Sequence, residues 1–125
     1  MPSSRRSPSP EVLALRAAAE ASCKQLRDQA GQQARLIRSG AAGELTEADV
    51  ERMAAGIAAA ARARLDAAAR EDETGPADQD LAVTRREAAM LMTTAAHQAE
   101  AVLRRAWQAR QEAAAGGRRR RWPGR

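Results

Sequence analysis

The sequence predicts an all-α fold: a three-helix up-down-up bundle or an extended helical hairpin with a long third helix, with disordered basic ends. Alanine, the strongest helix former, supplies 33 of the 125 residues. Phe and Tyr are absent and only 15 residues are Leu, Ile or Val, which argues against strands built on β-branched and aromatic side chains. Apolar residues recur at helical spacing in three segments separated by glycine or proline.

The first helix is expected at residues 10–39. It follows a Ser/Pro/Arg-rich arm, residues 1–9, that predicts disorder. Ser9 is placed as the N-cap, Pro10 as the first helical residue and Gly40 just beyond the last turn. An apolar stripe with a mean spacing near 3.6 residues runs along it: Val12, Leu15, Ala19, Cys23, Leu26, Ala30, Ala34 and Ile37.

The second helix is expected at residues 46–70. Thr46 and Asp49 have the spacing of a reciprocal capping box, and Leu45 and Val50 that of the hydrophobic staple beside it. The apolar stripe continues through Met53, Ile57, Ala61 and Leu65. Three consecutive acids at residues 71–73 oppose the helix dipole, so we expect the helix to end near Arg70.

The third helix is expected at residues 78–115, starting from Asp78 or Asp80 and ending at Gly116-Gly117. Its stripe repeats every seven residues: Leu81, Thr84, Ala88, Leu91, Ala95, Gln98, Val102, Arg105 and Ala109. A neighbouring line widens the apolar face: Met92, Ala96, Ala99, Leu103 and Trp107. We expect the first two-thirds to be buried and the last third to be exposed or bound to a partner. The predicted helix–helix contacts are Leu91, Val102, Leu103 and Trp107.

The positive charge is concentrated at the ends of the chain. Residues 1–10 and 116–125 carry seven arginines and no acid, whereas residues 11–115 have a net charge of −2. In the disordered tail predicted at residues 116–125, the candidate contacts to nucleic acid or anionic lipid are Arg118, Arg119, Arg120, Arg121, Trp122 and Arg125. A G+C-rich coding bias would produce the same arginine richness without any such partner.

Catalytic and metal-binding patterns are missing from the sequence. His97 is the only histidine and has no acid three or four residues away, and Cys23 is the only cysteine. The glycines at 40 and 43 lack the lysine of a phosphate-binding loop. We therefore expect no enzyme activity, no cofactor and no small-molecule substrate. The lone cysteine and the lack of a signal sequence favour a cytoplasmic location.

Residues 83–92, with Thr84, Glu87, Ala88, Ala89 and Leu91, resemble the opening helix of MerR- and excisionase-type helix-turn-helix proteins. That resemblance implies a turn at Thr93-Thr94, with Arg104 and Arg105 approaching DNA. The pattern after Leu91 continues as helix without a turn glycine or a strand-forming wing.

The function expected from these observations is that of a non-catalytic helical interaction or structural protein that self-associates or packs on a partner helix. The alternative is a nucleic-acid-binding accessory protein that uses its C-terminal arginines. A peripheral binder of anionic membranes would use the same residues.

Overall fold

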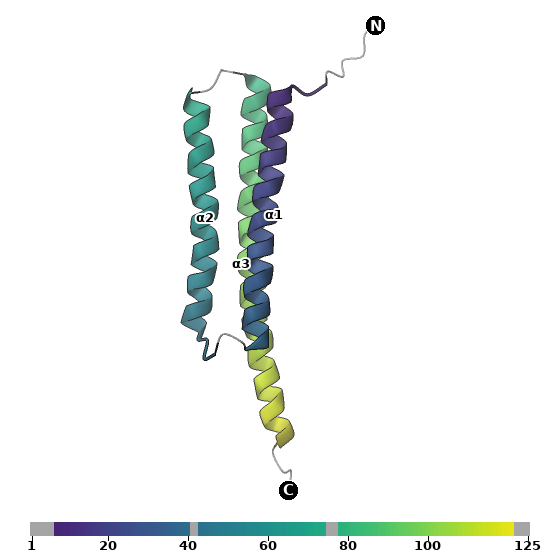
Figure 1. Cartoon of the computed structure of the whole chain (residues 1–125), viewed down its shortest axis with the longest axis vertical. Helices are drawn as coiled ribbons and strands as arrows, with labels where there is room; N and C mark the ends of the chain where they lie inside the picture. The colour runs from purple at the N-terminus through teal and green to yellow at the C-terminus, as the bar shows by residue number, and fades with distance from the viewer. Residues whose placement is uncertain (1–6, 41–42, 75–77, 122–125) are drawn as a thin grey trace.

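The molecule is a bundle of three helices. The computed structural model describes residues 7–40, 43–74 and 78–121, and no strand occurs among them. The helices are α1 (Pro10–Ser39), α2 (Glu47–Thr74) and α3 (Gln79–Arg121). α1 and α3 run in the same direction and α2 runs opposite to both (Figure 1). The predicted all-α fold is confirmed, in its bundle form with a long third helix.

The first helix begins and ends at the residues its capping signals indicate. The Ser9 hydroxyl accepts a hydrogen bond from the Val12 amide at 3.2 Å, and Pro10 occupies the first turn. Gly40 adopts the left-handed conformation with φ of 68°, which glycine reaches without the steric cost of a Cβ atom. The stripe predicted for this helix is buried except for Leu15, which is half-buried.

The second helix starts from the predicted capping box but continues past its predicted end. The Thr46 amide donates to Asp49 Oδ2 at 2.9 Å, and the Asp49 amide donates to Thr46 Oγ1 at 3.2 Å. The Thr46 amide and hydroxyl, which both donate to Asp49 Oδ2, lower the pKa of the Asp49 carboxyl, and Arg52 lowers it further. The prediction of an end near Arg70 is wrong, because the helix runs to Thr74. Asp72 is an ion-pair partner of Arg85 on α3, which holds the last turn in place.

The third helix is capped by Asp78, whose Oδ1 accepts from the amides of Asp80 and Leu81 at 2.9 and 3.5 Å. The helix continues to Arg121, so the predicted end at Ala115 is wrong. Among the described glycines only Gly40 and Gly43 have positive φ, so Gly116 and Gly117 do not supply the left-handed cap that stops a helix. Residues 1–6 and 122–125 lie outside the described residues.

The core combines a few large side chains with many alanines. Leu26, Ile37, Val50, Ile57 and Leu103 are fully buried. Around them pack small buried residues from all three helices, among them Cys23, Ala30, Ala34, Ala54, Ala61, Ala95, Ala99 and Ala106. None of the helices in the described ranges combines the length and the apolar character that a bilayer-spanning segment needs.

After Ala88 the buried face of α3 follows only part of the predicted seven-residue stripe, of which Ala95 is still buried. Leu91 and Arg105 are exposed, whereas the neighbouring line through Met92, Ala99 and Leu103 is buried. A strict seven-residue repeat drifts by about 20° per heptad around a straight helix. Over 43 residues this drift moves the predicted stripe off the core.

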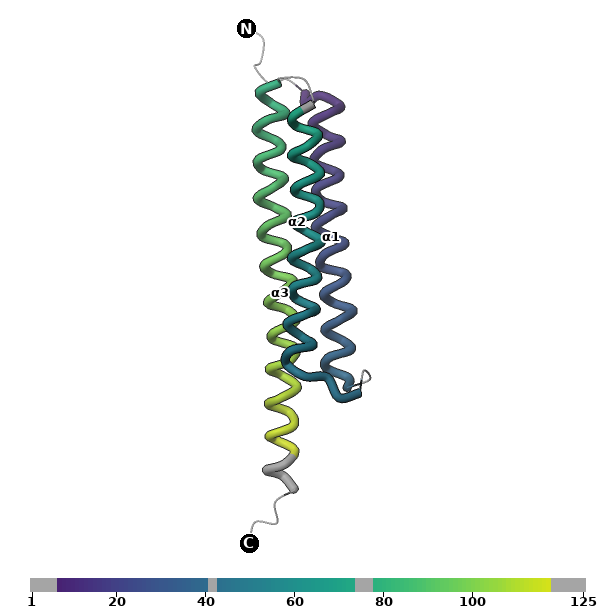
Figure 2. The backbone as a smooth tube through the Cα atoms, turned by 90° about the vertical axis from the view of Figure 1, so that its left-hand side faces the viewer, coloured from purple at the N-terminus to yellow at the C-terminus, as the bar shows by residue number. Residues whose placement is uncertain are grey.

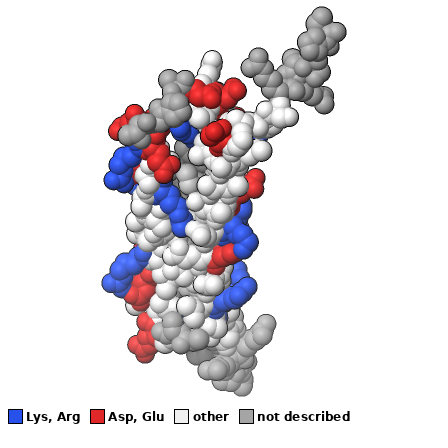
Figure 3. Space-filling model, turned by 45° about the horizontal axis from the view of Figure 1, so that its top comes forward, with Lys and Arg blue, Asp and Glu red and all other residues white. Residues whose placement is uncertain are grey.

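The three helices do not pack equally. α3 packs extensively on α1 and also on α2, whereas α1 and α2 contact each other only slightly. In Figure 2 α2 lies in front of α1 and α3, and α3 extends past the end of α1 and the start of α2. Six acids gather at the end where α1 begins and α2 ends (Figure 3): Glu11, Glu71, Asp72, Glu73, Asp78 and Asp80.

Candidate functional site: the groove between α1 and α3

The four predicted partner contacts separate into buried and exposed positions. Leu103 is fully buried in the bundle core, and Val102 and Trp107 are half-buried against that core. Leu91 keeps 54% of its surface exposed. The assignment of Leu103 to a partner surface is therefore corrected, because this side chain is covered by the protein's own helices. Leu91 is the exposed member of the four.

Leu91 lies beside a groove of about 640 Å³ between α1 and α3. Its neighbour Met90, which the sequence analysis did not select, is 71% exposed and lines the same groove. The other lining residues are small or polar: Glu20, Cys23 and Arg27 from α1, and Glu87, Thr94, Ala95 and Gln98 from α3. The groove therefore presents two large apolar side chains on an otherwise hydrophilic rim.

Small buried side chains lie at the bottom of the groove. Cys23 and Ala95 are buried and form its floor. The Cys23 thiol is free and buried, the usual place of a cysteine that serves as a small apolar residue. Met90 and Leu91 lie on the rim, exposed to solvent.

The charges on the rim are divided along the groove. Because α1 and α3 are parallel, Glu20 and Glu87 lie toward the starts of the two helices and Arg27 lies toward the other end. Lys24 pairs with Asp28 at 2.8 Å rather than with Glu20. Within the described residues, none of the three rim charges forms an ion pair. The rim thus has an acidic half and a basic half.

On the opposite side of α3, an ion pair fixes the start of α2. Arg104 donates from Nε to Glu51 Oε2 and from Nη2 to Glu51 Oε1, both at 3.0 Å. These hydrogen bonds lower the pKa of the Glu51 carboxyl and raise that of the Arg104 guanidinium. Glu100 adds a longer contact to Arg104 at 3.8 Å. Local spacing does not predict this pair, because its members are 53 positions apart.

Trp107 belongs to an internal cluster with Arg110. The Arg110 guanidinium carbon lies 5.8 Å from the centre of the Trp107 ring, a cation–π distance. Arg110 Nη1 donates to the Ile37 carbonyl and Arg110 Nη2 to the Gly43 carbonyl, both at 3.4 Å. Arg110 therefore ties α3 to the end of α1 and to the following connection. Trp107 is partly covered by these contacts.

The predicted anion-binding residues lie at or beyond the end of α3. The helical backbone includes Arg118 to Arg121. This part of α3 lies past the end of α1 and the start of α2 (Figure 1). Trp122 and Arg125 lie outside the described residues. The same helix is unbroken at Thr93-Thr94, so the turn that the helix-turn-helix resemblance implies is absent there.

The described residues contain no candidate metal centre. No cluster of three His, Cys, Asp or Glu side chains is placed to hold a metal ion among those residues. His97 is exposed on α3, and Cys23 is buried on α1. Comparisons of the chain with protein-family models, with curated proteins and with solved structures found no match.

Proposed function

We propose that this protein is a non-catalytic helical protein that self-associates, with a second copy packing on the groove between α1 and α3. The supporting observation is the pair Met90 and Leu91, two large apolar side chains that are adjacent and mostly exposed on an alanine-rich surface. Exposed apolar patches with a polar rim are typical of protein–protein contacts. The groove in front of them has room for apolar side chains of the second copy.

The rim charges favour an antiparallel arrangement of the two copies. A two-fold axis across the groove, near Cys23, would place Glu20 of one copy against Arg27 of the other, and the reverse contact follows by symmetry. A parallel arrangement would place acid against acid and base against base, which is repulsive. In the antiparallel dimer α1 and α3 of both copies form a four-helix layer, with α2 on the outside.

Light scattering after size exclusion tests the proposal with a matched pair of variants. The wild type is expected to elute as a dimer. Leu91→Asp is expected to give a helical monomer, because a buried carboxylate opposite its symmetry mate is costly. Leu36→Asp is the control, since Leu36 is 45% exposed on α1 and does not line the groove. A wild-type monomer that melts cooperatively, or equal dissociation of both variants, contradicts the proposal.

A charge exchange tests the antiparallel geometry separately. Arg27→Glu and Glu20→Arg are each expected to weaken the dimer, because each places like charges in contact. The double variant Arg27→Glu/Glu20→Arg is expected to recover most of the affinity. Concentration-dependent sedimentation provides the dissociation constants. Additive weakening in the double variant would exclude a contact between Glu20 of one copy and Arg27 of the other. It would not contradict self-association through Leu91.

A second candidate function is nucleic-acid binding through the C-terminal arginines. The observation that favours it is the continuation of the α3 backbone to Arg121, past the end of α1 and the start of α2. Four phosphate contacts would give a salt slope near −0.9 per contact, or about two decades of affinity between 50 and 200 mM salt. Removal of residues 116–125 should abolish binding to a generic duplex. Binding to anionic vesicles but not to the duplex would instead assign these residues to a lipid surface.

We also propose a cytoplasmic location. The support is the lone Cys23, which remains a buried free thiol and has no cysteine partner in the sequence. Cell fractionation of the tagged full-length protein tests this, and recovery in a membrane or extracellular fraction would contradict it.

A further inference from the structure

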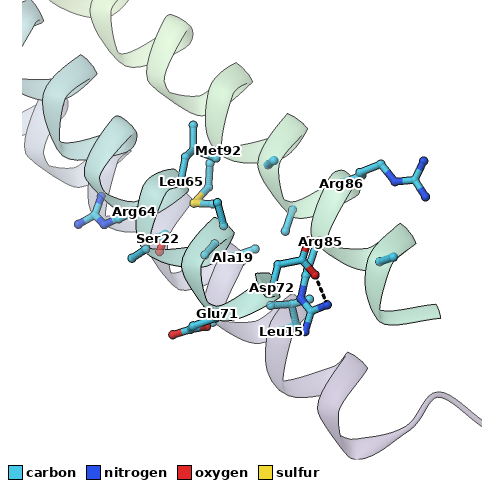
Figure 4. A pocket seen from close by; sticks show the side chains of 17 residues that line it. Leu15, Ala19, Ser22, Arg64, Leu65, Glu71, Asp72, Arg85, Arg86 and Met92 are labelled. Carbon is cyan, nitrogen blue, oxygen red and sulfur yellow. Dashed lines mark hydrogen bonds and ion pairs between the residues drawn. The ribbon is translucent and has the colours of Figure 1, made fainter. Parts of the chain in front are cut away.

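A second hollow lies among all three helices, at the end where α1 begins and α2 ends. It is a cavity with a volume of about 530 Å³ (Figure 4). Its apolar wall includes Leu15 and Ala19 of α1, Leu65 of α2 and Met92 of α3. Much of the remaining lining is alanine, and no aromatic side chain is among the described residues that line it. The cavity therefore has apolar walls and room for a ring that its own lining does not supply.

Two arginines that line this cavity already have hydrogen-bond partners. Arg85 pairs with Asp72 across α3 and α2 (Figure 4), and its side chain is only 18% exposed. Arg64 donates from Nη2 to Gln25 Oε1 at 2.9 Å, which links α2 to α1. A guanidinium that is paired at its edge keeps a flat face for an aromatic ring, and the thioether of Met92 also contacts rings favourably. An aromatic side chain therefore suits this cavity.

The end of the bundle beside the cavity is acidic. Residues 71–80 carry five acids and no base, and Glu11 lies at the start of α1 at the same end. Glu71 and Asp72 also line the cavity. Arg86 lines it as well, but its side chain points away from it (Figure 4). A basic segment is therefore attracted to this end of the bundle.

One segment of this chain combines an aromatic ring with consecutive basic residues. Arg118–Arg121 are four consecutive arginines, and Trp122 follows them directly. The α3 helix carries this segment away from the bundle. Arg110 meets the Ile37 carbonyl near the end of α1, and the helix continues for eleven more residues to Arg121, about 16 Å. This end of α3 lies opposite the end that holds the cavity (Figure 1).

A copy cannot place Trp122 in its own cavity. Leu15 and Ile37 are 22 residues apart on α1, about 33 Å of helix. From the level of Ile37 the α3 backbone runs farther away from Leu15, and Trp122 follows that helix directly. A ring from this segment therefore has to come from a second copy.

We propose that Trp122 of one copy binds in this cavity of a second copy, with Arg118–Arg121 against the acids at that end. The dimensions agree, since Leu15 lies five residues, about 8 Å, inside the start of α1, and the projecting part of α3 is longer than that. The contact does not use the groove between α1 and α3, so it is independent of the dimer proposed above. Each copy has one such segment and one cavity, so the contact repeats from copy to copy.

Two complementary full-length variants test this contact between molecules. Trp122→Ala keeps the cavity and removes the ring, whereas Ala68→Leu keeps the ring and fills the cavity that Ala68 lines. The Trp122→Ala protein is labelled with ¹³C at its methionine methyls and titrated with unlabelled Ala68→Leu protein. The ring current of the indole is expected to shift the Met92 resonance saturably. The matched donor, Ala68→Leu/Trp122→Ala, is expected to leave Met92 unchanged.

Met90 distinguishes this contact from self-association through the groove. Met90 lines the groove and Met92 lines the cavity, so packing on the groove shifts Met90 equally with both donors. The proposal is overturned if Met92 does not move with the Ala68→Leu donor, or moves as much with the matched donor. A shift of Met90 alone overturns it too, and still supports the groove.

A charge variant of the donor tests the arginines. Arg120→Gln/Arg121→Gln, added to the Ala68→Leu donor, is expected to weaken binding about three- to tenfold, because exposed ion pairs are individually weak. The control is Arg62→Gln/Arg105→Gln, which removes the same charge from exposed positions of the bundle and is expected to change binding little. Equal weakening by both would overturn the role assigned to the C-terminal arginines.

Light scattering completes the test with unlabelled protein. At rising concentration the wild type is expected to form larger species than either Trp122→Ala or Ala68→Leu, because each variant lacks one half of the repeating contact. Equal masses for all three proteins would overturn the proposal, whether those masses are of monomers or of dimers.

Discussion

The two sides of α3 are held by different means. Toward α1 many of the buried side chains are small, such as Cys23, Ala30 and Ala99, and the groove on this side opens at the surface of the bundle. Toward α2 two ion pairs, Glu51–Arg104 and Asp72–Arg85, lie near the ends of the bundle, and a cavity opens near one of them. Alanine therefore permits close packing where two helices run together, and leaves empty space where the third helix diverges.

The largest expected effect is the loss of stability when a leucine in the core of α1 is truncated, compared with a leucine in the wall of the cavity. Leu26→Ala is expected to lower the free energy of unfolding by about 2–5 kcal/mol, since Leu26 is fully buried. Leu65→Ala is expected to cost about 1 kcal/mol, because Leu65 is half-buried and already borders empty space. Urea denaturation measures both. Equal costs would mean that the α2 side is as tightly packed as the α1 side.

Insertion of volume should give opposite results on the two sides. Ala99→Leu is expected to destabilise the protein by about 1–3 kcal/mol, because Ala99 is buried in the core with no room for three more carbons. Ala68→Leu, which extends into the cavity, is expected to be neutral or stabilising. Thermal unfolding of the two variants at the same protein concentration shows whether each substitution raises or lowers the melting temperature. Destabilisation by both variants would remove the distinction.

A smaller effect concerns helical glycines. A Cβ at Gly56 of α2 or at Gly31 of α1 would meet nothing within 4 Å, so alanine at either position should stabilise the protein by about 0.5–1 kcal/mol. Native-state hydrogen exchange should locate the gain. If α2 opens by itself, Gly56→Ala slows exchange only in α2, whereas Gly31→Ala slows it in α1 and α3 together. Identical exchange patterns would show that the three helices open as one unit.

The smallest expected effect is that of the polar contact between α2 and α3. Hydrogen bonds from Arg104 lower the pKa of Glu51 in the folded protein. Its stabilising contribution is therefore complete above its ordinary pKa, about 4.3, and is lost as the pH falls through the lowered folded value. Glu51→Gln should slightly lower the melting temperature at pH 7 and leave it unchanged near pH 2. A difference that persists at pH 2 would assign the effect to packing rather than to charge.

The sequence predicted the local features well. Helix starts at Ser9 and Thr46 and the stop at Gly40 depend on side chains within four residues of each other, so the pattern contains the full interaction. The buried stripe of α1 also followed from spacing, because that helix keeps one face toward the core along its length.

The features that were missed depend on residues far apart in the chain. The end of α2 depends on the partner of Asp72 in α3, and Arg110 meets carbonyls more than sixty positions earlier. The shift of the buried face of α3 after Ala88 depends on where α1 and α2 lie around it. Spacing along one helix contains none of this information.

The parallel alignment of α1 and α3 also affects how the chain reaches its native state. Most up-down bundles begin to fold through hairpins of helices that are neighbours in sequence, which keeps contact order low. Here the α1–α2 hairpin has little contact to stabilise it, whereas native contacts between α1 and α3 join residues as far as 73 positions apart. Stable structure therefore forms only after the chain closes a loop that contains all of α2. During synthesis, α1 remains without its main partner until α3 has left the ribosome.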